Sequence, residues 1–276
     1  MRAIEAELAA APGVVSVWYG PPGGPAAYQR AAETTHYAAS TMKLALLAAL
    51  HRAADAGGLD LDAETEVRND FASAAPGGPR FACRRDHDND DAVWGRLGDV
   101  ATLRWLADRM IVRSSNLAAN LVLAAVGRPE ADEAWRAVGA RHSVVGRGIE
   151  DSAAADAGIT NLVTAADLAA LLGGIARGTA AAPRACRAML DTLLAQERTE
   201  DIAAGLPPGT RIAHKNGWIT GVRLAAGIVY PDDAPPFVLT VCATTPWATS
   251  GRDDRACQLV ARIAAAAWAA RHALPG

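Results

Sequence analysis

Closely spaced cysteines, long hydrophobic runs and an excess of positive charge are all missing from this sequence of 276 residues. Its four cysteines include no Cys-x-x-Cys pair, so we expect ordinary reduced thiols rather than a metal or redox site. No hydrophobic run approaches the roughly 20 residues of a membrane span. The formal net charge is −3, whereas proteins that bind nucleic acid usually carry a basic surface. We therefore expect neither a membrane nor a nucleic acid as a partner.

The common signatures of cofactor and metal sites are absent as well. The sequence has no GxGxxG or P-loop motif for nucleotides, no HExxH for zinc and no GxSxG nucleophile turn. The acidic run Asp86–Asp91 lacks the glycine and the terminal glutamate of a calcium loop, so we interpret it as a solvated acidic loop. We expect no metal and no organic cofactor.

The N-terminal segment does not resemble a secretory signal. Glu5 and Glu7 interrupt the region in which a signal peptide needs uninterrupted apolar residues. If Met1 is the native start, the sequence therefore predicts a cytoplasmic protein.

Lysine is scarce in this chain. Among 27 basic residues, only Lys43 and Lys215 are lysines, and the others are arginines. A desolvated lysine amine can lose its proton at neutral pH, which a guanidinium does not do. The two lysines are therefore the first candidates for chemistry.

Hydrophobic patterning places strands at both ends of the chain and helices between them. This order predicts one α+β fold, in which residues 1–49 and 206–276 form an antiparallel sheet flanked by the terminal helices. Residues 50–205 are expected to form an inserted all-helical lobe, with the active site at the junction of the two lobes. The predicted strands are 14–19, 26–30, 211–214, 222–230 and 237–244, and the predicted helices are 2–11, 41–56, 101–112, 117–126, 164–177, 185–197 and 253–272.

Ser40 and Lys43 stand at the start of the predicted buried helix 41–56. Positions i and i+3 share one helix face, so the Lys43 amine can reach the Ser40 hydroxyl. The helix N-terminus adds positive potential there. A serine beside a neutral lysine is an activated nucleophile. Taken alone, the pair is also consistent with a serine helix cap followed by an ordinary lysine.

A second polar group, Ser114-Ser115-Asn116, precedes the predicted helix 117–126. Ser114 and Asn116 can point the same way from an extended turn. The hydroxyl could relay a proton and the carboxamide could hold an amide substrate. Helix capping explains the same residues if they are taken alone.

A third group, Lys215-Asn216-Gly217, closes the predicted strand 211–214. The small Gly217 would let the backbone of a substrate approach the strand edge. A lysine at a strand end before a turn is the alternative. The neighbouring His214 is expected to pack beneath the site rather than act as a base.

Together, and in this order, the motifs SxxK, SxN and KxG resemble those of the serine penicillin-binding protein and class A β-lactamase superfamily, over nearly the whole chain. The resemblance implies a β-lactamase/transpeptidase-like fold. It also implies a serine hydrolase that acts on an amide or ester through an acyl-enzyme and needs no cofactor.

The resemblance implies roles for the reacting groups. Ser40 would attack a carbonyl carbon, and Lys43 would act as the general base or assist it. Desolvation and the nearby Lys215 would lower the pKa of the Lys43 amine toward neutrality. Ser114 would pass a proton to the leaving nitrogen.

The resemblance also implies how a substrate is held. Asn116 would bind the amide of the acyl side chain, and Lys215 would attract a carboxylate. The backbone N–H groups of Ser40 and Trp218 would form the oxyanion hole, each contributing about 3 kcal/mol. The expected partner is a small molecule that carries a carboxylate.

One departure from the family pattern concerns deacylation. Glu150 lies 34 residues after Asn116, which suits the glutamate that activates water in class A enzymes. The usual Glu-Pro pair is absent, however, and Ala154 stands where a water-holding asparagine is expected. Glu150 could instead be a loop carboxylate paired with Arg147.

Other departures affect substrate binding. Asn216 replaces the usual threonine or serine of the third motif, which removes a hydroxyl and narrows the groove. Ser115 replaces the usual aspartate of the second motif, which would loosen a structural hydrogen-bond network. Arg223 and Arg211 are alternative anchors for the substrate carboxylate.

Three functions are consistent with these residues. The first is a class A-like β-lactamase. The second is an esterase, amidase or acyltransferase acting on another metabolite. The third is a protein that traps an acyl group without turnover. Glu150 discriminates among them, since turnover requires it to reach a water near Ser40.

Overall fold

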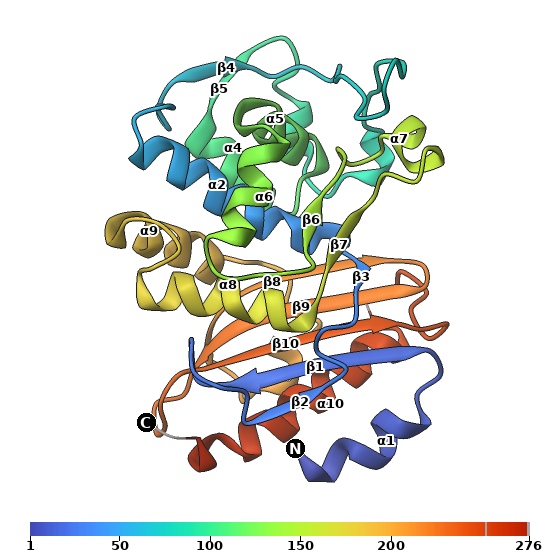
Figure 1. Cartoon of the computed structure of the whole chain (residues 1–276), viewed down its shortest axis with the longest axis vertical. Helices are drawn as coiled ribbons and strands as arrows, with labels where there is room; N and C mark the ends of the chain where they lie inside the picture. Colours follow the sequence, from blue (N-terminus) through green and yellow to red (C-terminus); the bar gives the residue numbers. More distant parts are fainter. Residues whose placement is uncertain (252, 275–276) are drawn as a thin grey trace.

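The computed structural model describes residues 1–251 and 253–274. A five-stranded antiparallel sheet has the order β2-β1-β10-β9-β8. Figure 1 shows α1 and α10 below this sheet, α8 and α9 on its other side, and the remaining helices above them. The strands of the sheet are β1 (Val14–Gly20), β2 (Tyr28–Arg30), β8 (Arg211–Ile219), β9 (Val222–Tyr230) and β10 (Phe237–Thr244).

Ten α-helices and several two- and three-residue strands complete the described part of the chain. The helices are α1 (Glu5–Ala10), α2 (Lys43–Asp55), α3 (Asp91–Trp94), α4 (Leu103–Val112), α5 (Asn116–Val126), α6 (Arg128–Arg136), α7 (Ser152–Asp156), α8 (Ala165–Arg177), α9 (Pro183–Leu194) and α10 (Arg255–Ala269). The short strands are β3 (His36–Tyr37), β4 (Glu64–Glu66), β5 (Val100–Thr102), β6 (Val144–Val145) and β7 (Asn161–Val163).

The two ends of the chain meet in the sheet. Strand β1 pairs antiparallel with β10, which places Val17 opposite Val241. Helix α10 covers one face of the sheet and α8 covers the other. Because both faces are covered, β9 is buried along nearly its whole length. This burial explains why its residues, apart from the buried Arg223, are hydrophobic or small instead of alternating with polar ones.

Helix α2, which follows Ser40, lies at the centre of the helices above the sheet. Helix α2 is buried from Lys43 through His51 and packs against α4, α5, α6 and α9. A helix that is apolar on all sides is stable only when it is surrounded in this way. The preceding 3-10 turn η2 (Ala39–Met42) contacts β8. Burial of α2 thus holds its N-terminal end against the sheet.

The expectation that residues 50–205 are all-helical was wrong, because this segment contains the short strands β4, β5, β6 and β7. Several predicted boundaries differ from the observed ones by one to five residues, and two of these differences have a clear physical reason. The strand predicted at 211–214 extends to Ile219, so the Lys215-Asn216-Gly217 group lies inside β8 with Lys215 opposite Ala226. Lysine, asparagine and glycine are poor strand formers, and the pairing with β9 overrides that preference. The helix predicted at 101–112 begins only at Leu103, because β5 pairs with β4.

All four cysteines are free and buried, as expected for reduced thiols. Within residues 1–251 and 253–274, no helix combines the length and the hydrophobicity needed to cross a membrane.

Candidate active site

Ser40 and Lys43 lie where the buried helix begins. Ser40 stands in the turn η2, and Lys43 is the first residue of α2. Lys43 Nζ is 3.0 Å from Ser40 Oγ, as the i, i+3 spacing predicts. Ser40 is half-buried, whereas Lys43 has no exposed surface. An accessible hydroxyl therefore lies beside a desolvated amine.

Four oxygens surround the Lys43 amine. Besides Ser40 Oγ, they are Ser114 O at 2.8 Å, Ser114 Oγ at 3.2 Å and Asn116 Oδ1 at 2.9 Å. The Ser114 carbonyl and the Asn116 amide oxygen can only accept hydrogen bonds. A neutral amine has two N–H groups for these two oxygens. Its lone pair then remains for the proton of a serine hydroxyl.

The protonation of Lys43 fits this arrangement. Burial lowers the pKa of Lys43 to about 7, although Asp88 and Cys83 oppose the shift. Desolvation disfavours the charged form of an amine, and here it outweighs the nearby negative groups. Near neutral pH, a large fraction of the molecules therefore holds Lys43 as a neutral amine that can accept a proton.

Ser114 adopts an unusual backbone conformation. Its φ of 60° lies in the left-handed region, which side chains other than glycine adopt at a cost. In this conformation both its carbonyl oxygen and its hydroxyl lie within hydrogen-bond distance of Lys43 Nζ. The next residue, Ser115, caps α5 by accepting a hydrogen bond from Ala118 N–H at 3.1 Å.

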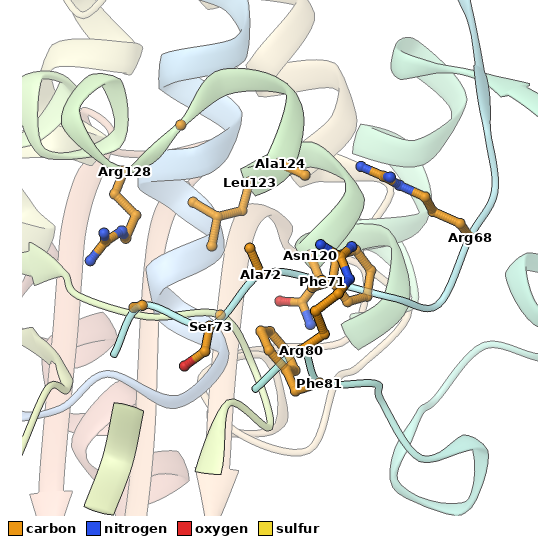
Figure 2. A pocket seen from close by; sticks show the side chains of 13 residues that line it. Arg68, Phe71, Ala72, Ser73, Arg80, Phe81, Asn120, Leu123, Ala124 and Arg128 are labelled. Carbon is orange, nitrogen blue, oxygen red and sulfur yellow. The ribbon is translucent and has the colours of Figure 1, made fainter. Parts of the chain in front are cut away.

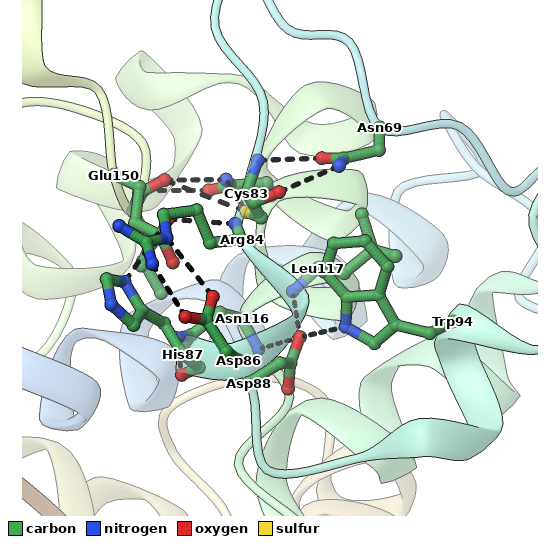
Figure 3. Close-up of polar contacts among 12 residues, drawn as sticks. Asn69, Cys83, Arg84, Asp86, His87, Asp88, Trp94, Asn116, Leu117 and Glu150 are labelled. Carbon is green, nitrogen blue, oxygen red and sulfur yellow. Dashed lines mark hydrogen bonds and ion pairs between the residues drawn. The ribbon is translucent and has the colours of Figure 1, made fainter.

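Asp88 holds the Ser115–Asn116 turn, and our sequence analysis missed this role. Its Oδ2 accepts hydrogen bonds from Ser115 Oγ, Asn116 N, Leu117 N and Trp94 Nε1 at 2.9–3.2 Å (Figure 3). We expected Ser115 to loosen a network that an aspartate usually maintains. Instead, a carboxylate from a loop distant in sequence maintains it, and the only sequence signal was that loop's acidic composition.

The interpretation of Asp86–Asp91 as a solvated loop was correct for its exposed members and wrong for two others. Asp88 is half-buried against α5, and Asp90 is 3% exposed. Asp90 caps α3 and pairs with Arg109 through two contacts of 2.5 and 2.6 Å. The loop is thus anchored to the helices that carry the second motif. Among the described residues, no group of three or more potential ligands could hold a metal ion.

Removal of the Asp88 carboxylate is expected to destabilise the protein and the site together. Asp88→Ala leaves four donors without their acceptor, which should lower the free energy of unfolding by about 3 kcal/mol. Asp86→Ala is the matched control, because the exposed Asp86 pairs with the Arg84 side chain and, among the described residues, makes no hydrogen bond to α5. Urea unfolding of both variants measures the effect. Equal unfolding midpoints would contradict an anchoring role for Asp88.

Lys215 is buried in β8 and bonded to its own neighbour. Its Nζ donates to Asn216 O at 2.7 Å and lies 3.5 Å from Asn216 Oδ1. Burial lowers the pKa of Lys215 well below its ordinary value, and Lys43 and Arg198 push it the same way while Asp201 opposes them. The charge of Lys43 thus acts on Lys215, although the two residues lie 172 positions apart in the sequence.

Asn216 does not face the groove as a free amide. It is fully buried, and its Nδ2 donates to Asp201 Oδ2 at 2.8 Å. The other oxygen of Asp201 accepts from Arg223 Nε at 2.6 Å. Asp201, which our sequence analysis did not single out, thus joins the third motif to Arg223. Its network orients Asn216 and, through it, Lys215.

Arg223 and Arg211, which we considered as anchors for the substrate carboxylate, both contact other groups of the protein. Arg223 is 2% exposed and also donates to Gly251 O at 3.0 Å, so its guanidinium belongs to the internal network. Arg211 lies at the start of β8, over the ring of Tyr230 at 4.7 Å. Arg198, which we did not consider, lies 5.8 Å from the ring centre of Trp218 and near Lys215.

Gly217 is required by the close approach of β8 to Ser40. A Cβ atom at this position would lie 2.7 Å from Ser40 N and 3.0 Å from Thr41 N. Both are backbone atoms that cannot move aside without displacing η2. The glycine thus lets β8 pass directly beside the Ser40 nitrogen, with Trp218 as the next residue.

Glu150 lies in a strained turn and makes few contacts. Its φ is 68°, and its Oε2 accepts from Arg84 N at 2.9 Å and lies 3.7 Å from His87 Nδ1. Its Oε1 is buried without a hydrogen-bond partner in the described part of the chain. Arg147 donates to Tyr37 Oη at 3.2 Å, so the expected alternative of a Glu150–Arg147 pair is wrong.

The Asn120 side chain binds the backbone of Ile149, the residue just before Glu150. Ile149 N donates to Asn120 Oδ1 at 2.8 Å, and Asn120 Nδ2 donates to Ile149 O at 2.9 Å. Its position four residues after Asn116, on the same face of α5, was the signal that could have identified it. Among the described residues, no hydrogen bond or ion pair joins Glu150 to Ser40 or Lys43.

Comparison of the sequence with known families and proteins gives consistent matches. A model described as the beta-lactamase enzyme family matches residues 1–270. A curated β-lactamase of Streptomyces lavendulae is 33% identical over 147 residues, which are 52% of this chain and 48% of that protein. The chain spans about half the length of the curated relatives it matches.

Solved structures match over nearly the whole chain. A β-lactamase from Sphaerobacter thermophilus has 26% identity and a TM-score of 0.80, and the match covers 100% of this chain and 98% of that one. PBP-A has 22% identity and a TM-score of 0.81, with 99% and 96% covered. A variant of PBP-A was solved as an acyl-enzyme complex with penicillin G. These likenesses confirm the predicted β-lactamase/transpeptidase-like α+β fold.

Proposed function

Because the chain belongs to the beta-lactamase enzyme family, we propose that it is a serine hydrolase that opens the amide of a β-lactam through an acyl-enzyme on Ser40. The observation that carries this proposal is the Lys43 amine, whose pKa is about 7 and which lies 3.0 Å from a half-buried hydroxyl. The proposal includes the division into two lobes, residues 1–49 with 206–276 and residues 50–205, with the site between them.

Acylation follows from the hydrogen bonds of Lys43. The neutral amine takes the proton of Ser40 Oγ while its own N–H groups stay on Ser114 O and Asn116 Oδ1. The Ser40 oxygen forms a bond to the substrate carbonyl carbon. The ammonium that results has a third N–H group, and Ser114 Oγ at 3.2 Å can accept from it.

The leaving nitrogen receives its proton from Ser114. As the carbon–nitrogen bond breaks, Ser114 Oγ gives its proton to the nitrogen and is reprotonated by the Lys43 ammonium. The negative charge on the substrate oxygen is stabilised by the N–H groups of Ser40 and Trp218. The closeness of β8 to Ser40 N at Gly217 supports this oxyanion hole, in which each donor contributes about 3 kcal/mol.

The substrate carboxylate is expected to bind Lys215 and Arg198. A carboxylate stabilises the charged form of the Lys215 amine, which burial otherwise disfavours. Arg198, 5.8 Å from the Trp218 ring centre and 3.8 Å from Glu200, adds a second cation that acts on Lys215. Arg223 has a different role in this proposal: it positions Asn216 through Asp201. Asn116 Nδ2 donates one N–H to His87 O at 3.1 Å and offers its other N–H to the amide of the acyl side chain. Gly217 leaves room for the substrate backbone.

Glu150 is the proposed base for deacylation, acting through its unpartnered Oε1. We expect Glu150→Gln to lengthen the lifetime of the acyl-enzyme at least tenfold, because an amide cannot accept a proton from water. Quenched-flow mixing followed by mass spectrometry of the intact protein gives the lifetime of the acyl-enzyme. Glu130→Gln, an exposed change on α6, is the matched control. Equal lifetimes in wild type and Glu150→Gln would remove Glu150 from the reaction.

A second function, trapping of an acyl group with little turnover, is favoured by one observation. Asn120 binds the backbone of Ile149 rather than Glu150, and within the described residues no hydrogen bond or ion pair joins Glu150 to Ser40 or Lys43. A carboxylate held away from the ester would release the acyl group slowly. The two functions share the acylation step and differ only in the second step.

Mass spectrometry of the intact protein over time tests the proposal. The protein is mixed with benzylpenicillin, a cephalosporin or p-nitrophenyl acetate, and the lactam concentration is followed in parallel. We expect an adduct with the mass of the whole lactam, since the leaving nitrogen stays tethered, and then its loss with turnover. A persistent adduct supports the trapping function. Reaction with the ester alone supports an esterase, and no adduct and no turnover of any compound refutes the serine hydrolase.

A further inference from the structure

A cavity of about 400 Å³ lies between α5 and the loop of residues 68–81, outside the site built on Ser40. Its size is at the lower end of the range for small-molecule sites, roughly 300–1000 Å³. Its lining includes Arg68, Phe71, Phe81, Asn120, Leu123 and Arg128 (Figure 2). Among them only Asn120 has a role in the proposed active site, which is to hold Ile149 beside Glu150.

The charge of the cavity is positive in a chain whose formal net charge is −3. Arg68, Arg80 and Arg128 line it, and none of the described lining residues is acidic, although the buried Asp151 accepts hydrogen bonds from the lining residues Ser73 and Ala74 at 2.7 Å. Arg80 is partly compensated by Asp70, with Nε 2.6 Å from Oδ1. Arg128 donates to Gly146 O at 2.9 Å, which is a neutral carbonyl. The lining thus favours an anionic ligand.

The floor of the cavity is apolar and firmly held. The rings of Phe71 and Phe81 lie with their centres 5.6 Å apart. Two backbone hydrogen bonds of 2.9 Å join these residues, so the rings come from an ordered pair rather than from a loose loop. Leu123 adds aliphatic surface from α5. Phe71 and Leu123 are already largely buried, so the half-buried Phe81 supplies most of the apolar surface that an aromatic ring could cover and an inorganic anion could not.

We propose that this cavity binds a compact aromatic carboxylate. The ring packs on Phe71, Phe81 and Leu123, and the carboxylate is attracted by the guanidinium groups of the arginines that line the cavity. Guanidinium pairs a carboxylate through parallel hydrogen bonds, which makes it the appropriate cation for this ligand. The site is separate from the one proposed for the Ser40 substrate.

The cavity is in contact with the turn that carries Glu150. Asn120 lines it, and the same side chain accepts from Ile149 N–H at 2.8 Å. Gly148 lines it as well, and a Cβ there would lie 2.6 Å from Phe81 Cζ. A ligand that packs against Phe81 and Asn120 is therefore expected to restrict this turn. Hydrogen exchange of the Ile149 amide should become slower when the cavity is filled.

Titration with benzoate, followed by calorimetry and by hydrogen exchange, tests the proposal on the whole protein. We expect the Arg68→Gln/Arg128→Gln double variant to raise the dissociation constant at least tenfold. The control Arg187→Gln removes an exposed charge on α9 and should leave it unchanged. Ala124→Trp, which places an indole at the cavity without removing a charge, should also weaken binding. It keeps the test valid if the double variant does not fold.

Two further comparisons distinguish binding in this cavity from nonspecific anion binding and from binding at the Ser40 site. Benzamide and acetate should each bind at least tenfold more weakly than benzoate, because one lacks the charge and the other lacks the ring. Lys215→Met should retain benzoate binding, since that lysine belongs to the other site. The proposal is overturned if the arginine and indole variants bind benzoate like the wild type, if acetate binds as tightly, or if binding is lost in Lys215→Met. Unchanged exchange at Ile149 with bound benzoate would place the ligand elsewhere.

Discussion

The Ser40→Ala protein is expected to gain no mass on exposure to a β-lactam under conditions in which the wild type forms an adduct. Ser40 Oγ is the hydroxyl beside the Lys43 amine that ligands can reach, so its removal leaves the base without a nucleophile. Loss of a nucleophilic serine lowers catalysis by about 10⁶-fold in the best-measured case. We expect acylation to fall below detection, which is a loss of at least roughly 10³-fold.

Intact-mass spectrometry at equal protein and lactam concentrations measures this effect. Ser152→Ala is the matched control, because it removes an exposed hydroxyl at the start of α7 and should label like the wild type. Circular dichroism establishes that both variants fold. If Ser40→Ala still forms the adduct, the nucleophile is another residue, and peptide mapping would then identify it.

The acylation rate should rise with pH and level off above about pH 7. Burial lowers the pKa of Lys43 to about 7, so the amine is neutral above that pH and can accept the Ser40 proton. Below it the neutral fraction, and with it the rate, should fall about tenfold per pH unit. Lys43→Met should lower the plateau by roughly 10³-fold and remove this dependence, since no general base remains.

Lys43→Arg is the informative control for the charge of this residue. Arginine retains a positive charge but does not lose its proton in a protein, so the variant should be as slow as Lys43→Met. Rates are measured by stopped-flow absorbance of a chromogenic cephalosporin between pH 5 and pH 9, in buffers of constant ionic strength. An active Lys43→Arg protein, or a wild-type rate independent of pH, would exclude Lys43 as the base.

The lowered pKa of Lys43 also makes the stability of the protein depend on pH. Between pH 7 and the ordinary lysine pKa of 10.5, the unfolded chain binds a proton at Lys43 that the folded protein lacks. The free energy of unfolding contributed by this group therefore rises with pH across that window. The difference in stability between wild type and Lys43→Met should change in the same direction, which urea unfolding at pH 7 and pH 9 would measure.

The Ser40–Lys43 pair could be predicted because local geometry alone decides it. Residues three apart in a helix share a face, whatever surrounds the helix. The strands β9 and β10 were predicted for a related reason, since their composition favours a strand buried on both faces. The strand β8 was predicted short, because its lysine, asparagine and glycine form a strand only when β9 is beside them.

The partners of the site could not be predicted, because they come from distant segments. Asp88 replaces the carboxylate that Ser115 lacks, and nothing in the local sequence indicates which acidic residue of its loop turns inward. Arg223 was expected to face the substrate, but Asp201 holds it inside the protein. In both cases the decisive contact joins residues more than 20 positions apart.

The amino-acid sequence by itself determined the Ser40–Lys43 pair that we propose as nucleophile and base, the order of strands and helices, and the three motifs that indicate the family. These depend on short-range spacing and hydrophobic periodicity, which the chain carries at every stage of folding. Only the tertiary structure decided which carboxylates hold the motifs, where the arginines point and what Glu150 can reach. Those depend on desolvation and on charge pairing, and both exist only once the packed interior has excluded water.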